Sequence, residues 1–316
     1  VQDGIAYFAA GIVDHDGTYV YAVDAKTGKI KWQNNSCGHL NPELRKGVSA
    51  QGNLAIQGDR LLMAGGNQVS PAAFDLATGK CLNESFAQGN PKANHGKFVG
   101  VFQGEYPISG GRILYASPRN VANKDSFVLT RNGRPTPLNF GGIPPVWNDD
   151  ALAMVDFRNG KLACYEMNKA SDRVAKGFPP PDRANPQPRR WSSFAQAFEA
   201  DGAARWKTDL DSPNKFEVLA LAATPDRIAA IVQFQNRARA HPQWQVIAFN
   251  AADGTPVWFW RHDLPFEPLP EGLAVGRDGQ LIVTTLDGNV LSLGPKRPRP
   301  AVTDRARPKP KPRVRD

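Results

Sequence analysis

A short motif recurs five times along the 316-residue chain, and this repetition constrains the fold more than any other feature of the sequence. The clearest copy runs from Tyr19 to Trp32. Further copies run from Pro71 to Cys81, from Ala151 to Cys164 and from Val246 to Trp258, and a copy one residue shorter runs from Phe198 to Trp206. Internal repetition of one small unit is typical of propellers and solenoids, in which neighbouring units bury a continuous core.

Each copy consists of an apolar strand, a tight turn and a second strand. The Asp or Asn that ends the first strand can hydrogen-bond the turn backbone, and the Gly that follows supplies a positive φ, so the motif predicts a β-hairpin. We expect an architectural role for the shared positions, which are Asp24, Gly28, Trp32, Asp75, Gly79, Asp156, Gly160, Gly202, Trp206, Asn250, Gly254 and Trp258.

Two such hairpins make one four-stranded propeller blade. A second hairpin precedes some of the repeats, for example over residues 54 to 64 and 218 to 234. Successive turn glycines, Gly288 included, lie 51, 81, 42, 52 and 34 residues apart, whereas a blade usually takes about 40 to 50 residues. The longest gap contains a strand and turn at Phe127 to Gly133, which indicates an irregular or inserted blade there.

We therefore predict an all-β fold, a β-propeller of four-stranded antiparallel blades. Five to seven recognisable or partial blades are expected, and a complete ring of eight blades is an alternative that the sequence does not decide. The last repeat, Leu281 to Leu293, stops before an outermost strand, and the chain begins within a pattern at Asp3-Gly4. Either the N-terminus completes the last blade or the ring is open.

Apolar residues occupy both faces of several strands, as in Val218 to Ala223, which is typical of strands buried on both sides. A parallel α/β protein would also need crossover helices, and the connections here are of hairpin length. The segment Trp191 to Ala204 is interpreted as strand because it continues into a repeat. We expect an exposed Pro-rich insertion at about 168–190, a propeller domain over 1–294 and a disordered tail over 295–316.

The net charge of +9 belongs mainly to the tail. Residues 295–316 contain nine Lys or Arg and two Asp, a net charge of +7, which leaves +2 for the preceding 294 residues. A uniformly basic nucleic-acid-binding domain is thereby disfavoured. The tail has no interleaved aromatic residues, so we expect at most weak, salt-sensitive binding to an anionic surface. No stretch approaches the roughly 18 apolar residues of a membrane helix.

The repeat resembles the tryptophan-docking repeat of the pyrroloquinoline-quinone (PQQ) family of β-propellers. Ala22, Asp24, Thr27, Gly28 and Trp32 carry the resemblance. Asn83 stands where the second copy would have its Trp, and Asn250 replaces Asp in the copy that ends at Trp258. The resemblance implies that Trp32, Trp206 and Trp258 pack between neighbouring blades, and it implies an exported, periplasmic location.

The family includes quinone-dependent alcohol and glucose dehydrogenases as well as non-enzymatic relatives, one of them the propeller lipoprotein of the outer-membrane β-barrel assembly machinery. Its dehydrogenases stack the quinone on a Trp, the alcohol enzymes also on an adjacent Cys-Cys disulfide, and hold a metal with Glu, Asn and Asp. This sequence has no Cys-Cys pair and no haem motif. We therefore expect no cofactor, although PQQ stays an alternative.

Other candidate sites have ordinary structural explanations. The run Asp14-His15-Asp16 could hold a metal, but it lies between two predicted strands, where a turn is expected. The histidines at 39, 95, 241 and 262 occur singly, without the spacing of a metal-binding motif. The Gly-Gly pairs at 65, 110 and 141 lack a following helix with Lys-Ser or Lys-Thr. Trp258 and Trp260 are interpreted as packing residues. Cys37, Cys81 and Cys164 are widely spaced, and their disulfide state is left open.

The sequence thus predicts a non-enzymatic scaffold or protein-interaction propeller that binds a protein or peptide at its rim or central funnel. The alternative is a divergent PQQ-dependent oxidoreductase of the alcohol or sugar dehydrogenase type. That alternative requires a Trp and at least one carboxylate to converge near the channel, with room for a planar cofactor.

Overall fold

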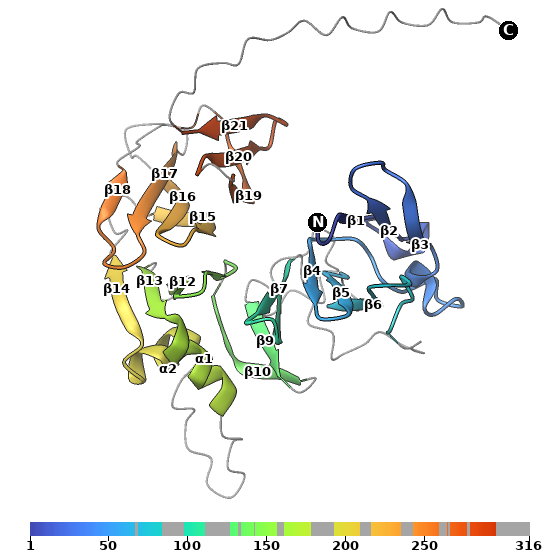
Figure 1. Cartoon of the computed structure of the whole chain (residues 1–316), viewed down its shortest axis with the longest axis horizontal. Helices are drawn as coiled ribbons and strands as arrows, with labels where there is room; N and C mark the ends of the chain where they lie inside the picture. Colours follow the sequence, from blue (N-terminus) through green and yellow to red (C-terminus); the bar gives the residue numbers. More distant parts are fainter. Residues whose placement is uncertain are drawn as a thin grey trace, which may run out of the picture.

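The structure is a computed structural model, and it describes residues 1–66, 69–83, 98–110, 127–131, 134–141, 143–156, 161–177, 193–208, 216–234, 243–258, 264, 266–276 and 279–294. The described residues form 21 β-strands and two short α-helices. The strands make six antiparallel sheets that follow one another in chain order around an arc (Figure 1). The all-β propeller class that the sequence predicts is confirmed, and six sheets fall within the predicted five to seven blades.

The first three blades take up the N-terminal half of the chain. The first blade consists of β1 (Ile5–Ala10), β2 (Tyr19–Asp24) and β3 (Ile30–Asn34), and the second of β4 (Leu54–Gln57), β5 (Arg60–Met63) and β6 (Ala72–Asp75). The third blade consists of β7 (Phe98–Phe102), β8 (Tyr106–Gly110), β9 (Phe127–Arg131) and β10 (Arg134–Asn139). This third sheet is the blade predicted within the longest gap between repeats.

The last three blades follow the same order. The fourth contains β11 (Val146–Trp147), β12 (Ala151–Asp156), β13 (Lys161–Glu166) and β14 (Ala204–Thr208), and the fifth contains β15 (Phe216–Ala223), β16 (Arg227–Phe234), β17 (Gln243–Asn250) and β18 (Pro256–Trp258). The sixth contains β19 (Pro268–Val275), β20 (Leu281–Thr285) and β21 (Val290–Leu293). The tail over 295–316 lies outside the described residues.

The repeat positions show which strand each incomplete blade lacks. In the fifth blade the motif occupies β17 and β18, the third and fourth strands. In the first blade it occupies β2 and β3, so β1 is equivalent to a second strand and the innermost strand has no counterpart among the described residues. In the sixth blade β19 lies beside β15, so the three strands present are the inner three. The first and sixth blades stand apart in Figure 1.

Two copies of the motif belong to one blade. The copy at Ala151 to Cys164 is the hairpin of β12 and β13, and the copy at Phe198 to Trp206 supplies β14 of the same sheet. Turn glycines therefore do not mark one blade each in this part of the chain, which explains the shorter spacing between Gly160 and Gly202.

The interpretation of Trp191 to Ala204 as strand is wrong. Residues Phe194–Ala200 form helix α2, which begins after Ser193, whose Oγ accepts a hydrogen bond from the Gln196 amide at 3.4 Å. Such a side-chain cap satisfies an amide that the first helical turn leaves without a partner. Phe194 and Phe198 lie one helical turn apart and are both fully buried. The Asp201-Gly202 turn then begins β14, so the repeat is present without its usual preceding strand.

The predicted loop at about 168–190 is also partly wrong, because Met167–Lys176 forms helix α1. Met167, Ala170 and Val174 recur at helical spacing and are buried, which gives the helix an apolar stripe against the sheet. Gly177 ends it with φ 72°, and its amide donates to the carbonyls of Arg173 and Val174. The Pro-rich part of the predicted insertion lies outside the described residues.

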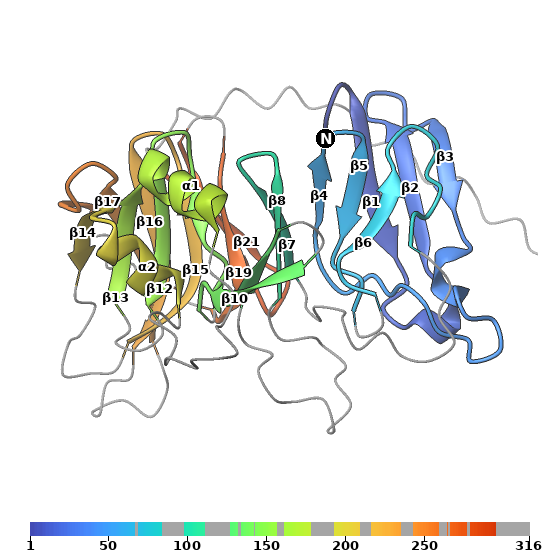
Figure 2. The same ribbon diagram turned by 90° about the horizontal axis from the view of Figure 1, so that it is seen from below.

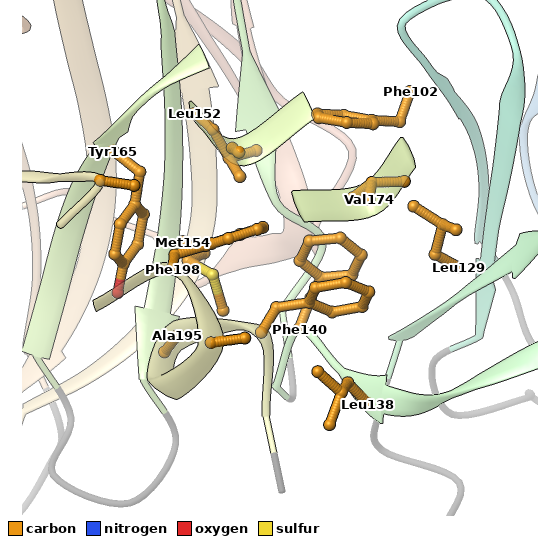
Figure 3. Packing of buried hydrophobic residues seen from close by; sticks show 14 of the residues in the cluster. Phe102, Leu129, Leu138, Phe140, Leu152, Met154, Tyr165, Val174, Ala195 and Phe198 are labelled. Carbon is orange, nitrogen blue, oxygen red and sulfur yellow. The ribbon is translucent and has the colours of Figure 1, made fainter. Parts of the chain in front are cut away.

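Both helices lie against the fourth blade (Figure 2). An ion pair joins Arg173 of α1 to Asp201 in the turn after α2. The helices cover a large apolar cluster between the third and fourth blades (Figure 3). The rings of Phe140 and Phe194 stack there with centroids 4.2 Å apart and planes at 15°, and aromatic pairs of this kind contribute about 0.5–1.5 kcal/mol beyond the area that they bury.

Smaller apolar clusters lie between the first and second blades, between the fourth and fifth and between the fifth and sixth. On the first blade only one face is covered: Val20 and Ala22 are fully buried against the second blade, whereas Phe8 on the opposite face is 46% exposed. The prediction that strands are buried on both faces therefore does not hold for this blade. Among the described residues, neither helix has the length and apolar character needed to cross a bilayer.

Candidate functional site

The channel side of the propeller contains a pocket of about 430 Å³. Its described lining comes from the innermost strands of five blades, or from residues next to them, and the first blade contributes none. The lining residues are Asn53, Phe98, Pro144, Pro145, Val146, Trp147, Leu221, Ala223 and Leu273. Propellers commonly bind ligands and partners at the surface around their central channel, so this pocket is the candidate site.

Trp147 is the largest side chain in the pocket, and its position depends on the third blade. Its ring meets Phe102 edge to face, with centroids 5.6 Å apart and planes at 77°. Gly100 lies directly beneath, since a Cβ there would be 3.2 Å from Cη2 of Trp147. The indole therefore packs closely on β7 at Gly100, where an added Cβ would also lie 3.1 Å from the Phe98 ring.

Asn53 is the single polar side chain among the described lining residues, and its amide joins two blades. Its Nδ2 donates to the Val99 carbonyl at 2.7 Å, and its Oδ1 accepts from the Val99 amide at 2.8 Å. The amide thus imitates a strand-to-strand pairing between the second and third blades. The rest of the described lining is apolar and carries no ionisable group, so these residues offer no nucleophile, no general acid or base and no metal ligand set.

The cofactor of the PQQ dehydrogenases does not fit these residues. PQQ is a planar quinone with three carboxylates, which need cationic partners when they leave water, and no Lys or Arg occurs in the described lining. Trp147 supplies the tryptophan that the alternative requires, but none of the described lining residues is a carboxylate that could hold a metal. Among the described residues, no cluster of three or more His, Cys, Asp or Glu is arranged to bind a metal ion.

Two of the repeat tryptophans each dock on the following blade. Trp32 of the first blade donates from Nε1 to the Leu76 carbonyl of the second blade at 3.0 Å, and its ring covers Gly79, where a Cβ would lie 2.3 Å from Cε3. Trp206 of the fourth blade repeats the arrangement on the fifth. It donates to the Ala251 carbonyl at 3.0 Å and covers Gly254, where a Cβ would lie 2.6 Å from Cδ2.

Among the described repeat glycines, Gly28 and Gly202 carry no docked tryptophan. A Cβ added to Gly28 or Gly202 would have no heavy atom within 4 Å. Asn83, which replaces the tryptophan of the second blade, accepts a hydrogen bond from the Ala73 amide at 2.8 Å within its own blade. Gly160 and the side chains of Asp156 and Trp258 lie outside the described part of the chain.

The repeat aspartates organise their turns. Asp24 accepts hydrogen bonds from the hydroxyl and the amide of Thr27, both at 2.8 Å, and Asp75 accepts the same pair from Thr78 at 2.6 and 2.7 Å. The threonine hydroxyl first, and then the threonine amide, hold the pKa of each carboxyl below its ordinary value. In the fifth blade Asn250 accepts from the Ala252 amide at 2.9 Å in the same place.

This arrangement predicts a pH-dependent contribution to stability. Because the folded-state pKa of Asp75 is lowered, its contribution is present above the unfolded-state pKa and is lost as pH falls through the folded-state value. We expect Asp75→Asn to lower the free energy of unfolding at about pH 7, and this effect to shrink as pH falls through the folded-state value and the wild-type carboxyl becomes protonated. Urea unfolding at several pH values measures this difference.

Asp59→Asn is the matched control, because the Asp59 carboxylate is exposed and meets Arg60 at 3.9 Å without a threonine in its turn. The control is expected to change stability little across the same pH range. A loss in Asp75→Asn that is equally large at both ends of the range would contradict the assignment.

The remaining candidates from the sequence have structural positions. Asp14–Asp16 forms a short 3-10 helix, and the His15 carbonyl accepts a hydrogen bond from Nη2 of Arg45 at 2.6 Å. His39 ends a second 3-10 helix, Cys37–His39. His95, His241 and His262 lie outside the described residues, as do Gly111, Gly142 and Trp260.

The three cysteines are all free thiols. Cys37 and Cys164 are fully buried, and Cys81 is half-buried. Burial raises the pKa of Cys37 to about 12 and that of Cys164 to about 11. Both thiols are therefore protonated and unreactive in the folded protein, because the thiolate is the reactive species.

A second hollow, of about 460 Å³, lies between the first and second blades. Tyr7, Trp32, Lys31, Asp59 and Asp75 contribute to its lining. Unlike the channel pocket, this second hollow is lined by charged side chains of both signs, namely Lys31, Asp59 and Asp75. Sequence reasoning identified Trp32 and Asp75 here through the repeat, but it missed the channel pocket, whose residues come from five blades and share no motif.

Comparisons with known proteins agree with the repeat assignment. The sequence model of the family described as outer membrane protein assembly factor BamB matches residues 1–171, which is more than half of the chain. A model described as strictosidine synthase-like, N-terminal, matches residues 261–293. No curated protein sequence matches the chain.

Solved structures with similar folds have low sequence identity. A quinohemoprotein alcohol dehydrogenase, ADHIIG from Pseudomonas putida HK5, is 11% identical, with 92% of this chain and 56% of that chain covered and a TM-score of 0.43. The Dos1 propeller is 10% identical, with coverage of 90% and 74% and a TM-score of 0.43. KlAtg21, in complex with the coiled coil of AgAtg16, is 11% identical, with coverage of 77% and 66% and a TM-score of 0.39.

The chain thus spans 66% of KlAtg21 and 56% of the alcohol dehydrogenase. At these identities and TM-scores the resemblance assigns no activity, and membership rests on the family model, the repeated motif and the docked tryptophans. This chain belongs to the family of PQQ-like repeat propellers that is represented by the outer membrane protein assembly factor BamB.

Proposed function

We propose that the chain is a non-enzymatic β-propeller scaffold whose channel pocket binds an apolar segment of a protein partner. The observation that carries this proposal is the lining of the pocket, in which five blades converge with apolar side chains and one amide. A concave apolar surface with few polar groups is what an apolar side chain or peptide segment needs for burial.

The rigidity of the lining supports a binding role. Leu221 and Ala223 belong to β15, which pairs with β16 along its length, and Trp147 is held by Phe102 and Gly100. A pocket built on paired strands loses little conformational entropy when a partner binds. The pocket therefore supplies a preformed site, whereas no described side chain in it supplies chemistry.

A location outside the cytoplasm is part of the proposal. The matching family takes its name from an outer-membrane protein assembly factor, and a partner with exposed apolar segments is chemically consistent with that setting. Fractionation of cells that express the full-length protein, followed by detection with an antibody to this chain, tests the location; recovery with the cytoplasmic fraction would contradict it.

Site-specific photo-crosslinking tests the binding site. A benzoylphenylalanine placed at Ala223, in the pocket, is expected to give a discrete protein adduct on irradiation in cells. The same group at Ala252, which is exposed in the turn of the same blade, is the matched control and is expected to give no such adduct. Equal adducts at the two positions would contradict a role for the pocket.

A pocket variant gives an independent measurement. We expect Ala223→Glu to weaken association with the crosslinked partner by tenfold or more, because about 1.4 kcal/mol corresponds to tenfold and an unpaired buried carboxylate costs more than that. Ala252→Glu is expected to have no effect. Turnover of alcohols or aldose sugars with an artificial electron acceptor, dependent on added PQQ and calcium, would overturn the non-enzymatic assignment in favour of the oxidoreductase.

A further inference from the structure

Two turns with exposed carboxylates border the channel pocket. Trp147 is the last residue of β11, and the turn that follows it contains Asp149 and Asp150. Ala223 is the last residue of β15, and Asp226 lies in the turn that follows. All three aspartates are exposed. Because consecutive Cα atoms are about 3.8 Å apart, the Cα of Asp149 lies within about 8 Å of Trp147 and that of Asp226 within about 11 Å of Ala223.

A side-chain amide holds these two turns against each other. Asn148 donates from Nδ2 to the Thr224 carbonyl at 2.6 Å, which joins the turn of the fourth blade to that of the fifth. Its Oδ1 accepts from the amides of Asp150 and Ala151 at 2.8 and 2.7 Å. The Thr224 hydroxyl donates to the Asp226 carboxylate at 2.8 Å. The carboxylates therefore stand on turns that are fixed before a partner binds.

The second and third blades add two more carboxylates at the same end of the channel. Asp59 lies in the turn between β4 and β5, and Glu105 lies in the turn between β7 and β8, at the upper end of Figure 2. Both residues are exposed, and Nε2 of Gln57 donates to the Glu105 carbonyl, which joins the two turns. Each of the four turns connects an innermost strand to the second strand of its blade. These turns, at residues 58–59, 103–105, 148–150 and 224–226, form the acidic mouth of the channel.

Three arginines offset part of this negative charge. Arg60 and Arg227 lie 3.9 and 3.3 Å from the aspartates that precede them, and Nη2 of Arg205 donates to the Asp150 carbonyl at 2.8 Å. Asp149 has no ion-pair partner among the described residues. Five carboxylates and three arginines leave a net charge of −2 at the acidic mouth, whereas residues 1–294 as a whole carry +2.

The spacing between the pocket and the acidic mouth suits one extended segment. An extended chain advances about 3.4 Å per residue, so about 8 to 11 Å corresponds to two or three residues. A segment whose apolar side chain fills the pocket therefore places residues two or three positions away beside the acidic mouth. Carboxylates at the border of a binding site favour a cationic neighbour and disfavour an anionic one.

We propose that the channel pocket selects apolar segments that are flanked by basic residues. The apolar anchor packs beside Trp147, and a Lys or Arg two or three residues away meets the acidic mouth near Asp149 and Asp226. This inference rests on the proposed function, because it assigns a partner chemistry to the same pocket. The anchor supplies most of the affinity, and the charges discriminate between segments that share an anchor.

Three synthetic peptides test the selection. Each contains the anchor Phe-Leu-Phe and a variable residue on either side, two positions from the anchor, and the two variable residues are both Lys, both Gln or both Glu. Binding of the dye-labelled peptides to the 316-residue chain is measured by fluorescence anisotropy. At low salt we expect the lysine peptide to bind about tenfold more tightly than the glutamate peptide, with the glutamine peptide between them. The difference should nearly vanish at about 1 M salt, where the screening length is about 3 Å.

The outcomes separate this inference from the proposed function. Equal affinities of the three peptides at low salt would overturn the selection of basic flanks and leave the apolar pocket standing. Failure of all three to bind would overturn the pocket as a binding site, and the selection with it. The glutamine peptide is expected to bind Ala223→Glu at least tenfold more weakly; unchanged affinity would place the anchor outside the pocket and would overturn the proposal.

A charge reversal in the protein locates the contact. Asp149→Lys is expected to weaken the lysine peptide about fivefold and to strengthen the glutamate peptide by a similar factor. Glu43→Lys is the matched control, because Glu43 is exposed in the connection from β3 to β4, which meets β4 at the end opposite the acidic mouth. The control should change either affinity by less than about twofold. Equal responses of the two variants would indicate a general charge effect and would overturn the role of the acidic mouth.

The basic residues of the chain's own segment 295–316 are the competing occupant. A full-length variant with Lys309→Gln, Lys311→Gln and Arg313→Gln tests them. If they occupied the acidic mouth, the lysine peptide would bind this variant about tenfold or more tightly than the wild type, because a tethered competitor would have been weakened. That result would overturn a partner segment as the occupant. The expected result is a change of less than about twofold.

Discussion

Replacing Trp206 with alanine is expected to lower the free energy of unfolding by about 3–5 kcal/mol, the range found for large aromatic residues removed from protein cores. Trp206 is 9% exposed, it lies beside Phe249 with ring centroids 5.9 Å apart, and its Nε1 donates to the Ala251 carbonyl at 3.0 Å. The variant therefore loses packing and also the indole donor to the Ala251 carbonyl, which keeps only the weaker thiol donor Cys164 Sγ at 3.6 Å. Urea unfolding followed by circular dichroism measures the change.

Trp206→Phe separates these two contributions. It keeps an aromatic ring over Gly254 but has no donor for Ala251, so we expect an intermediate loss, smaller than that of the alanine variant. A loss below about 1 kcal/mol for Trp206→Ala would place the tryptophan outside the structural core and would contradict its role in joining the fourth blade to the fifth.

Gly79→Ala is expected to destabilise the protein much more than Gly28→Ala, although the two glycines occupy the same place in the repeat. Both have φ +73°, and that left-handed conformation costs any other residue about 1–2 kcal/mol. Only Gly79 lies under a tryptophan, where an added Cβ would be 2.3 Å from the Trp32 ring, while the space around Gly28 is open. Overpacking adds about 1–3 kcal/mol to the cost at Gly79.

A double-mutant cycle assigns the difference to the tryptophan. In a Trp32→Ala background the space above Gly79 is vacant, so Gly79→Ala is expected to cost only as much as Gly28→Ala does in the wild type. Thermal or urea unfolding of the four proteins gives the coupling energy. Equal losses for Gly79→Ala with and without Trp32 would show that the indole does not dock there.

The contacts of Trp32 with Gly79 and of Trp206 with Gly254 explain why the repeat alone was enough to predict the fold class. An Asp, Gly and Trp at fixed spacing are each required by a local or nearest-neighbour interaction: Asp75 accepts from Thr78 within its own turn, and Gly79 receives Trp32 from the preceding blade. Interactions of this kind recur with the motif, so a reader of the sequence can recognise them. The propeller class and the antiparallel hairpins follow from them.

The two helices show where local pattern was misread. Phe198 to Trp206 matches the repeat in its Asp-Gly-Trp spacing, yet Ser193 caps a helix and the spacing of Phe194 and Phe198 gives that helix a buried side. The signals for the helix were present in the sequence, but the repeat outweighed them in our interpretation. The fold accommodates α2 because the turn at Asp201 and Gly202 leads into β14 whatever element precedes it.

The sequence by itself determined the architecture: the repeat specified hairpins, the hairpins specified blades, and the concentration of positive charge in residues 295–316 separated the tail from the rest. Only the tertiary structure decided where the candidate site lies. The channel pocket gathers Asn53, Trp147 and Leu273 from three blades. The physical reason is that a turn is set by neighbours in the chain, whereas a channel wall is set by strands that are distant in sequence and carry no common motif.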